Sequence, residues 1–227
     1  MGGRSTGSSI SRFRVVCFDL DGTLVPSPAS VCLHLSRWLG HEEVLADLEV
    51  AYAEGRIDNH EVAERDAVHY AGKTRSEIDL ELASLPLVSG IPETLARMRG
   101  MNMSALIATV TWRFAAEHLA DRFGFDEVTG CVMEEDCSGR FTGKVGRHID
   151  AADKVAFVRS FCEPRGIDLA DCVAVGDSRS DIPLFREVGL AIAFNGTDAA
   201  KRAAHVAVDG DSLLAILAVM QSPPGEA

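Results

Sequence analysis

The sequence predicts an α/β protein, in which a Rossmann-like parallel sheet forms the core and a small all-helical domain is inserted near the start. From about residue 90 onward, short apolar runs alternate with segments of helical spacing, which is typical of strand–helix–strand units. Residues 14–20 form a similar apolar run, so the first strand belongs with this later part. Residues 29–85 lie between them, are rich in Ala, Leu, Glu, Arg and His, and contain no good strand.

The apolar residues of the inserted segment are spaced as in amphipathic helices. Two stretches repeat apolar residues at helical spacing, and a weaker pattern covers residues 61–70. We therefore expect three or four helices, with Asp58 or Asn59 as the N-cap of the weaker one. The apolar positions of the two clear stretches are Val31, Leu35, Trp38 and Leu39, then Val44, Leu45, Leu48 and Tyr52. The predicted division is a core of 13–26 and 89–222, a cap of 27–88, and flexible tails of 1–12 and 223–227.

The second half of the chain predicts the rest of the sheet. A hairpin turn is expected at 137–143, and Asp150 is the expected N-cap of the helix that follows. The predicted strands are 103–108, 128–133, 172–175, 190–194 and 206–208, and the predicted helices are 114–123, 150–162, 181–188 and 211–220.

Composition limits the function. The chain has 227 residues, is 47% hydrophobic, and carries 22 basic against 34 acidic residues, a formal net charge of −12. This charge disfavours nucleic acid and anionic membrane surfaces as partners, and it means that a phosphate site needs a local positive charge. No apolar run reaches the roughly 18 residues of a membrane helix. Residues 1–6 fit a short myristoylation pattern, but the stretch reads as a flexible tail.

The six cysteines lack zinc-binding spacing and C-x-x-C pairs. Most lie in apolar runs, so we expect buried free thiols and a cytoplasmic protein. A bridge between Cys131 and Cys137 is the alternative.

Polar residues follow three predicted strands, where an open α/β sheet forms its ligand crevice. Asp19 and Asp21 follow the first strand, Thr109 follows the second, and Gly176-Asp177 leads to Asp181 after a later one. Lys154 lies on the helix between the last two. Each residue alone has an ordinary structural explanation, such as turn chemistry or a solvated helix charge. Their occurrence together indicates a site.

The chemistry of this set favours phosphoryl transfer. Asp19 and Asp177 side by side would repel each other unless a hard dication such as Mg²⁺ lay between them. Lys154 and Thr109 would then hold phosphate oxygens, a carboxylate would attack phosphorus, and a second acid would protonate the leaving oxygen.

From about residue 13 to 220 the chain resembles the haloacid dehalogenase-like hydrolases, in particular their phosphoserine phosphatase branch. Asp19-x-Asp21-Gly22-Thr23 is similar to the first motif of the family, Thr109 to the second, Lys154 to the third, and Gly176-Asp177-x-x-x-Asp181 to the fourth. The resemblance implies the following roles: Asp19 as nucleophile, Asp21 as general acid/base, Thr109, Val110 and Lys154 as phosphate ligands, Asp19, Asp177 and the Asp21 carbonyl as Mg²⁺ ligands, and Asp181 as support for the metal shell.

The substrate specificity of that branch does not carry over. Pro28 stands where its members have a glutamate for the substrate amine, Thr109-Val110-Thr111 replaces Ser-Gly-Gly, and Ser180 replaces an asparagine. We therefore expect another small phosphomonoester, an acidic one if Arg56, Arg65 or Lys73 meets it, with Ser180 as a further contact. His34, His60 and Trp112 are weaker candidates.

These observations predict a Mg²⁺-dependent phosphatase for a small phosphorylated metabolite, acting as a monomer or homodimer. A phosphomutase or phosphotransferase with the same chemistry, and a phosphate-ligand binding protein without activity, remain the alternatives. Segments 26–28 and 88–90 are expected to act as hinges of the cap.

Overall fold

A seven-stranded sheet forms the centre of the computed structural model, which describes residues 12–221. Its strand order is β4-β3-β2-β1-β5-β6-β7, and every pair is parallel except the edge pair β3–β4. The strands are β1 (Val15–Phe18), β2 (Ser104–Trp112), β3 (Glu127–Glu135), β4 (Phe141–Arg147), β5 (Cys172–Gly176), β6 (Leu190–Phe194) and β7 (Val206–Val208). This is the α/β class that the alternating pattern predicts.

Helices cover both faces of the sheet, because successive side chains of a strand point to opposite sides. Val15 and Cys17 of β1 pack in a cluster with α7 (Ala151–Cys162), α8 (Ile182–Phe185) and α9 (Asp198–Ala203). Val16 and Phe18 pack in the other cluster, with α5 (Ile91–Gly100), α6 (Arg113–Phe123) and α10 (Ala215–Gln221). Both faces of β1 are therefore buried, which explains its uninterrupted apolar sequence.

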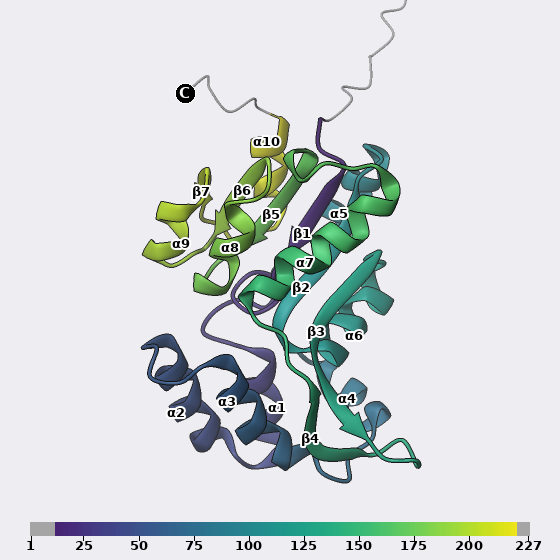
Figure 1. Ribbon diagram of the computed structural model, residues 1–227, viewed down its shortest axis with the longest axis vertical. Coiled ribbons are helices and arrows are strands. Elements are labelled where there is room, and N and C mark those ends of the chain that lie inside the picture. Colours follow the sequence, from purple (N-terminus) through teal and green to yellow (C-terminus); the bar gives the residue numbers. More distant parts are fainter. Residues whose placement is uncertain (1–11, 222–227) are drawn as a thin grey trace, which may run out of the picture.

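The segment between β1 and β2 begins with four α-helices, which Figure 1 shows beyond the carboxyl ends of the strands. They are α1 (Val31–Leu39), α2 (Glu42–Ala53), α3 (Asn59–Ala67) and α4 (Arg75–Leu82). Ser30 caps α1, Asp58 caps α3, and Thr74 with Glu77 forms a capping box on α4. Their apolar side chains, such as Leu35 of α1, belong to the same buried cluster as Val16 and Phe18.

Several element bounds differ from the predicted ones. β2 continues through Trp112 instead of ending at 108, α8 is a short helix that ends at Phe185, and α10 begins at Ala215 instead of 211. Among the α-helices and strands of the described residues, α5, α9 and the edge strand β4 were not predicted. The Gly and charged residues of β4 hide its strand pattern. Asp150 caps α7 through a capping box, as predicted.

The cysteines are free thiols, so a bridge between Cys131 and Cys137 is wrong. Cys131 is buried, whereas Cys137 is exposed on the β3–β4 turn. The predicted tails and the pattern at residues 1–6 lie outside the described residues, apart from Arg12. Between residues 12 and 221, no helix is both long enough and apolar enough to cross a membrane.

Candidate active site

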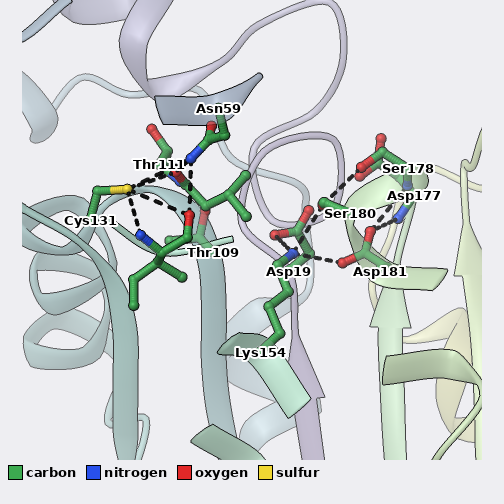
Figure 2. Close-up of polar contacts among 12 residues, drawn as sticks. Asp19, Asn59, Thr109, Thr111, Cys131, Lys154, Asp177, Ser178, Ser180 and Asp181 are labelled. Carbon is green, nitrogen blue, oxygen red and sulfur yellow. Dashed lines mark hydrogen bonds and ion pairs between the residues drawn. The ribbon is translucent and has the colours of Figure 1, made fainter. Parts of the chain in front are cut away.

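Two acids follow the neighbouring central strands. Phe18 of β1 pairs with Val175 of β5, so Asp19 and Asp177 leave the sheet at the same edge. Carboxylate oxygens of these two residues and of Asp181 all lie within 4.8 Å of one another. Figure 2 shows the three side chains converging above the strand ends. The structure thus brings together acids that are about 160 positions apart in the sequence.

Lys154 supplies the positive charge at this cluster. It lies on the first turns of α7 and is 1% exposed. Its Nζ donates to Asp19 Oδ1 at 2.8 Å, to Asp181 Oδ1 at 2.7 Å and to Ser180 Oγ at 3.2 Å. Burial alone lowers the pKa of Lys154, but Asp181 and Asp19 more than offset this effect, so its pKa is raised and it stays charged.

Burial dominates the ionisation of the acids. It raises the pKa of Asp19 to about 6, with the charge of Asp181 adding to the rise and Lys154 opposing it. Burial also raises the pKa of Asp177 to about 9, with a further contribution from Asp19. Without a bound cation, the cluster therefore resists full ionisation.

The site has the features of a divalent-cation site. Asp177 Oδ1 is buried and has no hydrogen-bond partner among the described residues. Gly22 makes room for this carboxylate, since a Cβ there would lie 2.2 Å from Asp177 Oδ2, and its φ of +84° favours glycine as well. Asp181 Oδ2 accepts the backbone N–H groups of Asp177 and Ser178, which fixes that loop. Clustered carboxylate oxygens of this kind suit Mg²⁺.

Asp21 lies beside the cluster but faces the inserted helices. Its Oδ1 accepts the backbone N–H of Val31, the first residue of α1, at 2.7 Å. Burial raises its pKa to about 7, and the hydrogen bond from Val31 opposes the rise. A carboxyl group with this pKa exchanges a proton readily near neutral pH.

The segment after the predicted second strand is a continuation of β2. The Thr109 hydroxyl is buried and accepts the N–H of Thr111 at 3.1 Å. The next carbonyl, that of Val110, accepts Asn59 Nδ2 at 2.9 Å and the Cys131 thiol at 3.3 Å. Asn59 also donates to the Ile149 carbonyl at 3.0 Å, so one side chain of α3 holds two segments beneath it (Figure 2).

A cavity of about 490 Å³ connects the strand ends with the inserted helices. Asp19, Asp21, Thr109, Val110, Asp177 and Ser180 all line it. Other lining residues were not predicted as part of a site, among them Cys32, Glu49, Tyr52, Asn59, Asp66 and Arg179. The sequence pattern predicts Tyr52 in an apolar stripe, but Tyr52 is only partly buried and lines this cavity. Val44 of the same stripe is 50% exposed.

The predicted substrate contacts fall into two groups. Ser180 is buried at the site, and Trp112 lines the cavity and donates through Nε1 to Asp66. Arg56 and Arg65 are exposed, pair with Glu54 and Glu61, and are not among the described residues that line the cavity. The remaining candidates also have other partners: Lys73 lies over the Trp38 ring, His34 contacts the Glu81 carbonyl, and His60 stacks on His148.

Residues 16–186 match the family model described as haloacid dehalogenase-like hydrolase. The chain belongs to this family. The match spans β1 to the end of α8 and contains every strand-end acid described above.

Several proteins of similar sequence are described as phosphoserine phosphatases. The chain is 26% identical over 211 residues to a phosphoserine phosphatase of Archaeoglobus fulgidus, covering 92% of this chain and 60% of that protein. It is 24% identical to one from Albidiferax ferrireducens, covering 93% and 91%. The chain spans only about half, 47%, of another such relative, from Streptomyces coelicolor.

Solved structures share the fold. A substrate-bound phosphoserine phosphatase complex superimposes with a TM-score of 0.80 at 21% identity, covering 91% of this chain and 98% of that one. A HAD family hydrolase from Salmonella enterica serovar Typhi gives 0.83 at 17% identity, covering 92% and 71%. At these identities the likeness establishes the architecture.

Proposed function

We propose that the protein is a Mg²⁺-dependent phosphatase that hydrolyses a small phosphomonoester through an aspartyl-phosphate intermediate. The observation that carries the proposal is the convergence of Asp19, Asp177 and Asp181 within 4.8 Å, with the buried Lys154 bonded to Asp19. The phosphatase descriptions of the relatives support the same reaction class.

Asp19 is the nucleophile in this proposal. Its carboxylate oxygen attacks phosphorus as the bond to the leaving oxygen breaks, and Asp21 gives that oxygen its proton. Asp21 then takes a proton from water, which attacks the phosphorus and releases inorganic phosphate and free Asp19. The raised pKa of Asp21, about 7, suits both steps near neutral pH.

The other residues of the site bind the metal ion and the phosphate group and balance their charges. Asp19, Asp177 and the Asp21 carbonyl would hold Mg²⁺, and Asp181 would support that set through the Asp177–Ser178 loop. The ion supplies charge neutralisation and orients the phosphate when bound. Thr109, the Val110 backbone and Lys154 would hold the remaining phosphate oxygens, so that the acids of this −12 chain do not repel the substrate.

The test measures inorganic phosphate release from p-nitrophenyl phosphate with Mg²⁺ and with EDTA. We expect Mg²⁺-dependent turnover that falls at least about 10³-fold in Asp19→Asn. Asp47→Asn, an exposed acid on α2, is the matched control and should keep its activity. Normal turnover by Asp19→Asn would refute the proposal, and conversion of a sugar phosphate to an isomer without phosphate release would favour a mutase instead.

A further inference from the structure

The end of the cavity away from the strand ends is formed by the inserted helices. Apart from the residues assigned to the phosphate end, three charged side chains line it among the residues that the structure describes: Glu49, Asp66 and Arg179. The partners of these three side chains determine which charge remains uncompensated where the leaving group of the substrate would bind.

Glu49 projects into the cavity from α2. It is partly buried, and its Oε1 accepts a hydrogen bond from the Ser30 hydroxyl. Within the described part of the chain, no Lys, Arg or His forms an ion pair with it. Its negative charge lies close enough to Asp21 to contribute to the raised pKa of that residue. Glu49 is thus a carboxylate with a positioning partner but without a counter-ion.

The other two charged groups are already engaged. Asp66 is 1% exposed, and its two oxygens accept His41 Nε2 at 2.8 Å and Trp112 Nε1 at 2.7 Å. Arg179 is exposed, with its guanidinium 4.0 Å from the centre of the Tyr52 ring. Arg179 therefore stacks on an exposed part of this wall, whereas the Glu49 and Asp66 carboxylates lie in more buried parts of it.

We propose that Glu49 determines specificity and that the substrate is a phosphomonoester whose alcohol part carries a protonated amine. This inference rests on the proposed phosphatase function and adds the substrate class to it. An ammonium group would provide the counter-ion that Glu49 lacks, whereas an anionic leaving group would be repelled by Glu49 and Asp66. The expected acidic substrate met by Arg56, Arg65 or Lys73 is therefore replaced by a basic one.

Substrates that differ only in this group provide the test. Glucosamine 6-phosphate is compared with glucose 6-phosphate, and O-phosphoethanolamine with 2-hydroxyethyl phosphate, all at pH 7 with Mg²⁺. We expect the wild type to prefer the amine in at least one pair by roughly 10- to 100-fold in kcat/KM, the range of a hydrogen bond to a charged group.

Glu49→Gln keeps the shape and the hydrogen bond with Ser30 but removes the charge. It should abolish the preference for the amine, measured as the ratio of kcat/KM within each pair, because an effect of the lost charge on the chemistry common to both substrates cancels in that ratio. Glu43→Gln, an exposed position on the same helix, is the matched control and should keep the preference.

The outcomes separate this inference from the proposed function. Turnover of p-nitrophenyl phosphate without any amine preference would overturn the role of Glu49 and leave the phosphatase standing. A preference for O-phosphoserine over O-phosphoethanolamine that Glu49→Gln keeps and Arg179→Gln loses would also overturn it, because the carboxylate and not the amine would then be recognised. No turnover of any phosphomonoester would refute the phosphatase itself.

Discussion

Lys154 is the residue on which the charge balance of the site depends. It is buried and bonded to two carboxylates, so its removal leaves Asp19 and Asp181 without a counter-charge. We expect Lys154→Met to lower the free energy of unfolding by about 3–5 kcal/mol and to abolish turnover. Thermal unfolding and p-nitrophenyl phosphate hydrolysis measure the two effects. Lys201→Met, which removes a surface ion pair with Asp209, is the control, and an unchanged Tm for Lys154→Met would contradict the assigned balance.

For Asp177 we expect the opposite effect on stability, because substitution of this acid should stabilise the metal-free protein. Its pKa is raised to about 9 in the folded protein, against about 4 for an unfolded chain. Folding therefore favours the protonated acid, and the associated stability is present below pH 4 and is lost as the pH rises towards 9. In EDTA, Asp177→Asn should unfold a few degrees above the wild type, by a margin that widens from pH 5 to pH 9. Asp121→Asn, an exposed acid on α6, should show no such trend, and a constant margin for Asp177→Asn would contradict the assignment.

At the scale of elements, α3 is joined to the end of β2 by Asn59. Asn59→Ala would leave the Val110 and Ile149 carbonyls without this donor, a loss of about 1–3 kcal/mol. Because Asn59 positions a backbone segment, we expect Asn59→Ala to lower kcat/KM about tenfold, equally for amine and neutral substrates. Inhibition by inorganic phosphate should become weaker as well. Glu64→Gln on the same helix removes only the charge of its contact with His148 and serves as control. An effect confined to one substrate class would assign Asn59 to specificity instead.

The predictions from the sequence were most accurate for the features that the sheet topology determines. The carboxyl ends of parallel strands share one edge, so the convergence of Asp19, Thr109 and Asp177 follows from strand order alone. The inserted helices lack such a constraint. Whether Glu49 faces the cavity depends on how α2 is rotated about its axis, and the mixed faces of α2 do not define that rotation. Arg56 lies in the turn that follows α2, where no periodic pattern predicts the direction of a side chain. β4 was missed for a related reason, since an edge strand is stabilised by pairing with β3 more than by its own residues.

At the scale of the whole molecule, the inserted helices contact the rest of the protein at several separate points, which lie on the sheet, on α6 and on the loop after β5. Beyond Asn59, these include Arg179 over Tyr52, Trp112 on Asp66, and Arg75 paired with Glu117. The two connecting segments are joined as well, since the Val88 N–H donates to the Leu24 carbonyl. We propose that the cap closes over the site by rotation about segments 26–28 and 88–90.

Closure predicts slower hydrogen exchange in α2 and α3 when Mg²⁺ and orthovanadate are added together. A ligand that contacts both parts stabilises the closed arrangement and suppresses local opening. Exchange measured by mass spectrometry should leave α10 unchanged, since it packs against β6 and β7 at the end of the molecule away from the inserted helices (Figure 1), and α10 is therefore the internal control. Identical exchange of α2 and α3 with and without the additions would count against cap motion.

The position of β1 has a consequence for how the protein is made. Among the strands that the structure describes, it is the first to leave the ribosome and the middle one of the sheet, but both of its neighbours, β2 and β5, are synthesised later. β5 begins about 150 residues after β1 ends, which corresponds to roughly 8–30 seconds at typical translation rates. For that time the apolar Val15–Phe18 segment has at least one unpaired edge, so productive folding in the cell depends on what shields those four residues while the rest of the chain emerges.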